Sequence, residues 1–309
     1  MERKISLSDL RKAVDEAYAA VEPIKEGEIN PRNLNAVAGQ FGITVVLTDG
    51  TTISKGDTKV KAPMGSIIHL PLHSVLFSQL GVDKVVEKSG KCPCNRLAPK
   101  PKGLAFGAHG IRAFSAVEPT GDPESKWNLY ENRMIDLMGS APELADNVYE
   151  YLQKEAADTK TAETLKENGY QLYDDTDLAL GLYLKALAMG ASTEQLAMMG
   201  ATVAADGVNP STGKIVYDGE LSQSLVGLMA AKGLHKMNTP WLVKAGIPAK
   251  SSFGGTVLGI IPGVMAVAAY APELNSVGVS VKAARVIMEL ARRLDLSVFA
   301  SARVKFVAD

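Results

Sequence analysis

Cysteine is scarce in this sequence. The 309 residues contain only two, Cys92 and Cys94, in the stretch KCPCN. A disulfide across one intervening residue would be strained, so a disulfide-stabilised secreted scaffold is excluded. The pair offers two metal ligands, but no second pair of Cys or His lies nearby in the sequence. We therefore predict two free thiols, no metal site and a cytoplasmic location.

The sequence also lacks a charge imbalance and a long apolar run. The net charge is −1, so we expect no nucleic acid and no membrane surface as partner. The most apolar stretch, LGIIPGVMAVAAYAP, is too short to cross a bilayer and is interrupted by Pro262 and Gly263, which indicates two buried strands. Because MERKISLSDL has no apolar centre, no secretory leader is expected at the start of the chain.

Strand patterns occur near both ends of the chain. FGITVVLTDGTTISKGD predicts a hairpin that turns at Asp49 and Gly50. SSFGGTVLGIIPGVMAVAAYAP has two apolar runs on either side of a Pro-Gly turn. Helical spacing of apolar residues precedes the first hairpin, from Leu7 to Val21, and follows the second in SVKAARVIMELARRLD.

The middle of the chain is mostly helical in its pattern. APELADNVYEYLQKEA predicts a helix with Pro142 at its first position, and DDTDLALGLYLKALAMG predicts one that stops at Gly190. Ser192 and Gln195 have the spacing of a capping box. A segment rich in Lys, Pro, Cys and Gly, from about Lys91 to Gly110, is predicted to be a loop.

Strands at both ends and helices between them predict an α+β fold. In this arrangement the two ends form one antiparallel sheet that helices cover, and the remaining helices form a second lobe. No low-complexity linker divides the chain. We therefore predict a single domain over residues 1–309, with a sheet lobe at about residues 1–62 and 240–309 and a helical lobe at about residues 63–239.

Several long segments resemble one family. LAMMGATVAADGVNPSTGKIV, GLMAAKGLHK and VKAGIPAKSSFGGTVLGIIPGVMAVAAYAPELNSVGVSVKAARVIMELARRLDLSVF are similar to the C-terminal half of the serine-dependent glutaminases. The similarity is nearly continuous from about Asp175 to Phe299, and the first hairpin and APMGSIIHL follow the family in order. The resemblance implies a β-lactamase/penicillin-binding-protein-like fold.

The activity implied by this resemblance is hydrolysis of L-glutamine. In such enzymes a serine attacks the side-chain amide, ammonia leaves, and water releases glutamate from the acyl-enzyme, with no metal or organic cofactor. This chemistry needs a base beside the hydroxyl, since a free serine is a weak nucleophile. It also needs preorganised donors for the oxyanion.

Part of the family's machinery can be placed on this sequence. Ser66 in APMGSIIHL matches the family nucleophile, and His69 stands where the family has its lysine base. Tyr183 matches a substrate-pocket tyrosine. Lys250 and Ser251 match the strand motif that lines the family's cleft.

Other family positions depart from the pattern. The resemblance places Ile29 at an early site tyrosine, Gly103 at a loop asparagine, and Leu152 near the glutamate that binds the α-amino group of the substrate. The companion asparagine falls near Asp158 or Thr159. These changes affect the predicted glutamine specificity more than the predicted fold.

Two further departures are candidates for the site. His235 replaces a family tyrosine and is a candidate second acid/base. Phe253 replaces a valine and, with Gly103, is a candidate substrate contact. His235 could equally be an ordinary polar residue after a glycine-terminated helix.

The pair Ser66 and His69 is itself open to two interpretations. Side chains at i and i+3 share a helix face, and histidine titrates near neutrality, which suits a general base. Pro71, however, would fall in the second turn of a helix that began at Ser66 and would remove a ladder bond. A helix start near Leu70 places Pro71 in the first turn but leaves Ser66 ahead of the helix, without the helix-end N–H groups that favour an acyl intermediate. The two interpretations are thus a working nucleophile with a histidine base and an inert or altered site.

Three functions therefore stay open at this stage. The first is a glutaminase-type amidohydrolase that uses Ser66, His69 and His235 on a small-molecule substrate. The second is a catalytically lapsed protein that keeps the fold for binding or assembly. The third is a hydrolase of a different small amide, favoured by the apolar Leu152 and Phe253. The resemblance also implies a homodimer or homotetramer.

Overall fold

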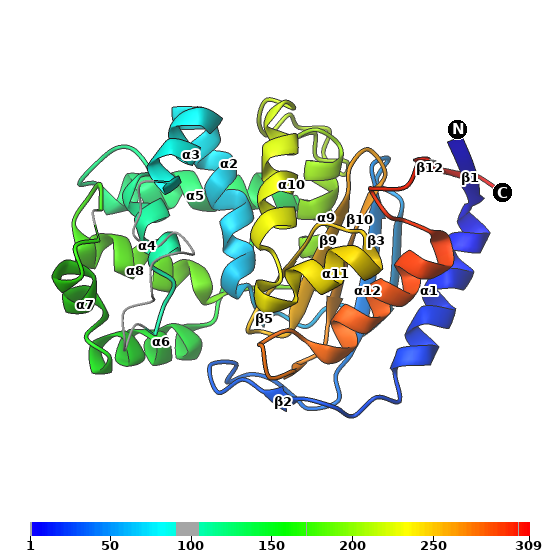
Figure 1. Ribbon diagram of the computed structural model, residues 1–309, viewed down its shortest axis with the longest axis horizontal. Helices are drawn as coiled ribbons and strands as arrows, with labels where there is room; N and C mark the ends of the chain where they lie inside the picture. The colour runs from blue at the N-terminus through cyan, green and yellow to red at the C-terminus, as the bar shows by residue number, and fades with distance from the viewer. Residues whose placement is uncertain (1, 91–104, 171, 302) are drawn as a thin grey trace.

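The structure is a computed structural model that describes residues 2–90, 105–170, 172–301 and 303–309 (Figure 1). Cys92 and Cys94, predicted to be free thiols, lie outside the described residues, as does Gly103, a predicted substrate contact.

The centre of the sheet lobe is a five-stranded antiparallel sheet with the order β4-β3-β10-β9-β8. Its strands are β3 (Gly42–Leu47), β4 (Thr52–Gly56), β8 (Ala249–Ser251), β9 (Thr256–Ile261) and β10 (Met265–Tyr270). The N-terminal hairpin meets the C-terminal strands where β3 pairs with β10, with Leu47 opposite Met265. The predicted α+β fold, with both ends of the chain in one sheet, is confirmed.

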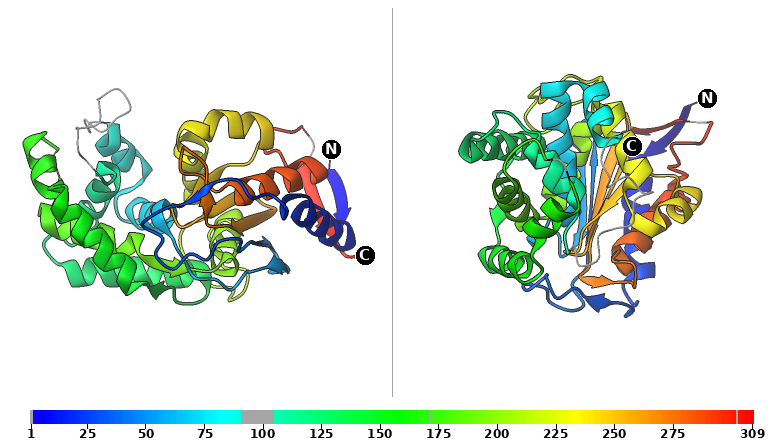
Figure 2. Two further views of the ribbon diagram at one scale, coloured as in Figure 1. Left: turned by 90° about the horizontal axis from the view of Figure 1, so that it is seen from below. Right: turned by 60° about the vertical axis from the view of Figure 1, so that its left-hand side comes forward.

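Helices cover both faces of this sheet (Figures 1 and 2). α9 (Thr193–Ala204) packs on one face, and α1 (Leu7–Val21) and α12 (Val281–Leu294) pack on the other. Successive side chains of a strand point to opposite faces, so Ala266 joins the core under α9 while Val267 joins the core under α12. Burial on both faces explains why these strands are continuous apolar runs in the sequence.

The helical lobe lies beside the sheet, at the left of Figure 1. Its elements are η1 (Gly65–Ile68), α2 (His69–Leu80), α3 (Val82–Gly90), α4 (Ala108–Ser115), α5 (Pro123–Met138), α6 (Asp146–Asp158), α7 (Thr161–Glu167) and α8 (Thr176–Leu187). α10 (Leu221–Lys232), η2 (His235–Met237) and α11 (Asn238–Ala245) lead back to the sheet. A buried ion pair between Lys126 and Asp174 ties α5 to the segment that enters α8.

Short strands join distant parts of the chain. β5 (Ala62–Pro63) and β6 (Glu143–Leu144) both pair with β7 (Met189–Ala191). β2 (Glu28–Ile29) pairs with β11 (Glu273–Leu274), and β1 (Glu2–Ser6) pairs in parallel with β12 (Arg303–Val307). The β5–β7 pair matters for the site, because it fixes the chain just before Ser66 against the chain just after α8.

Three local predictions are wrong. Pro142 precedes β6, and the helix that follows begins only at Asp146, because Glu143 and Leu144 pair with β7. Gly190 lies inside β7 and does not end α8, which stops at Leu187. The end of the predicted loop at Lys91–Gly110 is helical, since α4 begins at Ala108. The capping box at Ser192 and Gln195 is confirmed.

The described residues contain neither a candidate membrane-spanning helix nor a candidate metal cluster. Each helix in these residues is too short or too polar to span a bilayer. In the same residues, no group of three or more His, Cys, Asp and Glu side chains is arranged to hold a metal ion. The lobe boundaries near residues 62 and 240 stay a prediction.

Candidate active site

Ser66 lies in the 3-10 turn η1, which runs directly into α2. The predicted helix start near Leu70 is correct to within one residue, because α2 begins at His69. Pro71 therefore occupies the first turn of α2, where a backbone N–H would have no intrahelical partner and its loss costs no hydrogen bond. The proline is compatible with a serine placed just ahead of the helix.

The 3-10 turn brings Ser66 and His69 to the same side of the chain. Residues at i and i+3 eclipse one another in a 3-10 helix, and the His69 N–H donates to the Ser66 carbonyl oxygen. Both side chains line one cavity. Within the described residues the Ser66 hydroxyl makes no hydrogen bond, an open arrangement that catalytic pairs often have before substrate binds.

The residues after β8 pack against the turn that carries the serine. Gly65 has a φ of +47°, and a Cβ on it would lie 2.8 Å from Cδ1 of Phe253. Glycine tolerates this left-handed conformation and leaves room for the ring. The Ser252 hydroxyl donates to the Pro63 carbonyl oxygen at 2.6 Å. Phe253 is thus placed over the serine turn, and its side chain lines the cavity.

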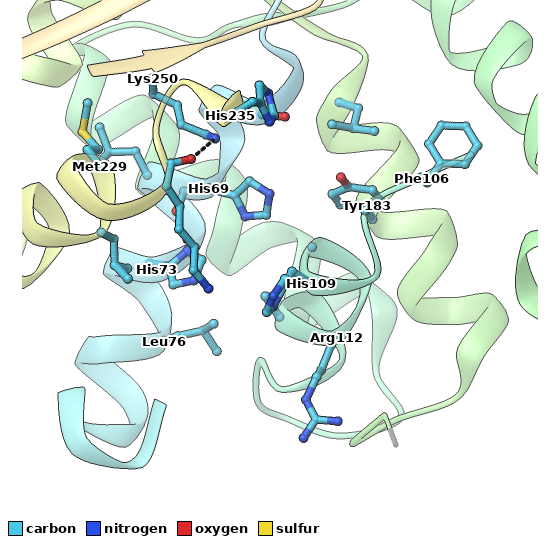
Figure 3. A pocket seen from close by; sticks show the side chains of 18 of the residues that line it. His69, His73, Leu76, Phe106, His109, Arg112, Tyr183, Met229, His235 and Lys250 are labelled. Carbon is cyan, nitrogen blue, oxygen red and sulfur yellow. Dashed lines mark hydrogen bonds between the residues drawn. The ribbon is translucent and has the colours of Figure 1, made fainter. Parts of the chain in front are cut away.

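The cavity has a volume of about 1230 Å³ and lies between the helices of the helical lobe and β8. It is lined by all four histidines of the chain, His69, His73, His109 and His235. Figure 3 shows His69 and His73 on α2, His109 on α4 and His235 at the start of η2, together with Tyr183 and Lys250. The fold therefore gathers the chain's imidazoles beside Ser66.

The two histidines of α2 are held neutral at pH 7. Burial, and then the neighbouring His73 and Lys250, lower the pKa of His69 well below its usual value. Burial lowers the pKa of His73 to about 4. The His73 Nδ1 lies 2.7 Å from the His69 carbonyl oxygen, which can only accept, so Nδ1 carries the proton and donates. A neutral imidazole at His69 can accept a proton from a serine hydroxyl.

Lys250 and Ser251 point to opposite faces of β8. The Lys250 side chain lines the cavity, and its Nζ donates to the carbonyl oxygens of Lys232 and Gly233 at 3.4 and 3.3 Å. Burial lowers the pKa of Lys250 to about 8. Ser251 is fully buried, does not line the cavity, and its hydroxyl has no hydrogen bond within the described residues. The structure does not bring Ser251 to the site.

Tyr183 on α8 forms part of the wall opposite α2. Its ring centroid lies 6.3 Å from that of His69, and the backbone N–H of Gly107 donates to its hydroxyl oxygen. Burial raises the pKa of Tyr183 to about 12, so the phenol stays neutral. A Cβ at Gly110 would lie 2.1 Å from Cε2 of Tyr183, so glycine is what lets α4 pack on this ring.

His235 lies at the edge of the cavity. It follows α10 in a left-handed conformation with a φ of +52°, which is uncommon for a residue with a side chain. Its side chain is exposed and lines the cavity, near Lys250 and above His69 in the view of Figure 3. The structure therefore brings Ser66, His69, His235, Tyr183, Lys250 and Phe253 together, as the sequence predicted.

The other family positions lie away from the cavity. Ile29 is in β2, opposite Glu273. Leu152 is fully buried in the core of the helical lobe, and Asp158 and Thr159 lie at the end of α6. None of these four lines the cavity. The sequence comparison at these four positions therefore did not identify residues of the cavity.

Sequence reasoning missed several residues that line the cavity. His73 fits an ordinary packed helix and His109 falls in a predicted loop, so neither has a local signal of function. Arg32 and Arg112 also line the cavity and lie in segments with no motif. The sequence offered one general signal. The chain has only four histidines, so each of them could have been considered as a candidate for the same site.

The fold and this site define a class of protein: a hydrolase with a β-lactamase-like fold and a serine just ahead of the first helix of its helical lobe. The glutaminase family profile matches residues 31–299. A glutaminase of Bacteroides fragilis is 33% identical over 99% of this chain and 100% of its own length. Glutaminase 1 of Escherichia coli O157:H7 is 27% identical over 96% of this chain and 99% of its own.

A solved structure gives the same result. "Probable glutaminase ybaS" superposes with a TM-score of 0.87 at 27% identity, and the match covers 96% of this chain and 100% of that one. The family profile alone spans far more than half of the sequence. The chain belongs to the glutaminase family.

Proposed function

We propose that the protein hydrolyses the side-chain amide of L-glutamine to L-glutamate and ammonia through an acyl-enzyme on Ser66. The observation that carries this proposal is that Ser66 and a neutral His69 line one cavity in a glutaminase-family chain. The Ser66 oxygen attacks the amide carbon while His69 accepts its proton. The protonated imidazole then gives that proton to the leaving nitrogen, and ammonia departs.

The second half of the reaction uses the same groups. His69 takes a proton from water, the hydroxide attacks the ester carbon, and the bond to the Ser66 oxygen breaks. The proton returns to Ser66 and glutamate leaves. We assign the oxyanion to the backbone N–H groups of Ser66 and Phe253, two residues that line the same cavity. Tyr183 and Lys250 contact the substrate, and His235 is a second acid/base at the edge of the cavity.

The direct test is release of ammonia and glutamate from L-glutamine by the purified protein. We expect turnover that saturates with glutamine, with equal amounts of the two products. L-Asparagine, whose amide lies one carbon closer to the α-carbon, should react more slowly, since a shift of about 1 Å at the reacting atom costs roughly a hundredfold. Release of ammonia from no amide at all would instead support a binding or assembly protein. A homodimer or homotetramer and a cytoplasmic location stay predictions.

The pH dependence of the reaction tests the charge of Lys250. With a pKa of about 8, this ammonium is charged below that pH and loses its proton above it. If its charge stabilises the negative charge that develops on the substrate during the reaction, kcat/KM should be level near neutrality and fall as the pH rises through about 8. On the acid side activity should persist below the usual histidine pKa, because the pKa of His69 is lowered.

The measurement is kcat/KM for ammonia release from about pH 5 to about pH 10. Lys250→Met should lack the alkaline limb, whereas Lys244→Met, an exposed lysine of α11, should keep the wild-type profile. A rate that rises through pH 8 would contradict this assignment, since the neutral amine of Lys250 would then be acting as the base.

A further inference from the structure

The described lysines and arginines give the lining of the cavity charges of one sign. Among the described residues its lining includes six lysines and arginines and no aspartate or glutamate; the six are Arg32, Lys88, Arg112, Lys232, Lys236 and Lys250. Attraction between opposite charges is strongest where water is partly excluded. This lining therefore favours an anionic group on the ligand and offers an ammonium group no partner of opposite charge.

Arg32 is the cation whose orientation is most completely determined. Its Nε and Nη2 donate to the two carboxylate oxygens of Glu155 on α6 at 2.7 and 2.6 Å. Nη2 also donates to the Ala105 carbonyl oxygen at 3.2 Å, and the guanidinium lies 4.9 Å from the Phe106 ring centroid. A bidentate pair holds the guanidinium plane rigidly. The Nη1 nitrogen of the guanidinium makes no hydrogen bond to the described residues.

Arg32 and Tyr183 belong to the same wall of the cavity. The positive charge of Arg32 is close enough to lower the pKa of the Tyr183 hydroxyl, against the larger effect of burial. Tyr183 in turn lies beside His69, and Figure 3 shows Phe106, on which Arg32 stacks, beyond Tyr183 as seen from His69. The wall thus runs from the reacting end at His69, past Tyr183, to Arg32.

The ion pair between Arg32 and Glu155 also occupies the carboxylate of Glu155, which therefore cannot bind an ammonium group of a ligand. Glu155 is the acid that Arg32 holds close to the cavity, but both of its oxygens are engaged by the guanidinium. The two side chains are each about one quarter exposed, so the ion pair is only partly screened by water. An α-ammonium group that entered the cavity would meet Arg32 and not Glu155.

We propose that Arg32, fixed by Glu155, is a specificity-determining residue that binds the carboxylate at the far end of the substrate. The preferred substrates are then ω-amides of dicarboxylic acids that carry no α-ammonium group, such as glutaramate, which is glutamine without its α-amino group. This inference rests on the proposed amide hydrolysis and ranks its substrates: glutaramate is hydrolysed with a higher kcat/KM than L-glutamine.

The test compares kcat/KM for glutaramate and L-glutamine, followed by ammonia release. The wild type should prefer glutaramate by about tenfold or more, because both substrates carry the carboxylate and only L-glutamine brings an ammonium group towards the Arg32 charge. Arg32→Gln should lower kcat/KM for glutaramate by about tenfold to a hundredfold, mainly through KM. It should affect L-glutamine less or improve it, because Glu155 is then free to accept from the α-ammonium. Arg32→Lys keeps the charge and should restore part of the preference.

The matched control is Lys214→Gln. This change breaks a comparable ion pair, between Lys214 and Asp136, whose residues do not line the cavity, and both substrates should keep their wild-type kcat/KM. Equal losses for both substrates in Arg32→Gln would show that Arg32 does not discriminate between them and would overturn its role in specificity. A wild type that prefers L-glutamine would also overturn the proposal.

Binding without turnover separates this inference from the proposed hydrolysis. Glutarate and L-glutamate are added to the wild type and to Arg32→Gln, and the shift in Tm and the Kd by calorimetry are measured. Glutarate should bind more tightly than L-glutamate to the wild type and lose that advantage in the variant. If glutarate binds in this way but no amide is hydrolysed, the proposed function fails and the assignment of Arg32 holds. If glutamine is hydrolysed and glutarate does not bind, the inference fails alone.

Discussion

Replacing Ser66 with alanine is expected to lower kcat for amide hydrolysis by about a thousandfold or more, the loss typical of removing a nucleophile. Ser66 is the hydroxyl that the 3-10 turn η1 presents to the cavity beside His69. Without it no acyl-enzyme can form, and only binding and the oxyanion donors remain. KM should change little, because the hydroxyl is not needed to hold the substrate. The measurement is ammonia release under saturating substrate.

The control for this variant is Ser78→Ala. Ser78 lies on α2, three turns beyond Ser66, where it is exposed and donates to the Ser74 carbonyl oxygen. Its replacement removes the same atom from the same helical segment outside the cavity and should leave kcat unchanged. If Ser66→Ala retained more than about a tenth of the wild-type rate, a second nucleophile or direct attack by water would have to replace the acyl-enzyme.

His69→Gln is expected to cause the second largest loss, about a hundredfold in kcat, which is the usual contribution of a general base. Glutamine is polar and similar in size but cannot take a proton at these pH values. The lowered pKa of His69 keeps the imidazole neutral at pH 7, and therefore in the form that accepts the serine proton. The low pKa also makes it a weaker base than an ordinary histidine, so the wild-type kcat should be modest.

His73→Gln provides the comparison for His69. His73 lies one turn further along α2, donates to the His69 carbonyl oxygen and lines the same cavity, but it is further from Ser66 along the helix. We expect less than a tenfold loss of kcat, with the acid limb of the pH profile unchanged. Equal losses in the two variants would indicate that the imidazoles act through the shape of α2. If His69→Gln kept its rate and Lys250→Met lost it, Lys250 would be the base.

The elements with strong local signals were predictable from the sequence. The hairpin of β9 and β10 turns at Gly263, which adopts a φ of +73° that glycine tolerates best. The capping box of α9 uses a side chain and a backbone N–H three residues apart. Even the start of α2 followed from Pro71, since a proline excludes all but the first turn of a helix. In each case the deciding contacts lie within a few residues.

The errors concern contacts between distant segments. Pro142 is a good first residue for a helix, but Glu143 and Leu144 pair with Met189 and Gly190 and delay the helix by one turn. Met189 and Gly190 can pair in this way because α8 ends at Leu187, just before them. Propensity is a weak preference, and tertiary pairing overrides it.

The residues of APMGSIIHL were therefore sufficient to locate Ser66 and an imidazole, that of His69, one 3-10 turn away. The electrostatic character of the cavity was decided by tertiary structure alone. Arg32 and Glu155 are 123 residues apart in the chain, and the four histidines come from α2, α4 and η2. The net charge of the whole chain is close to zero. It therefore gives no indication that, among the described residues, the cavity is lined by lysine and arginine and by no aspartate or glutamate. A local electric field depends on distances in space, and only the folded chain brings these charges together.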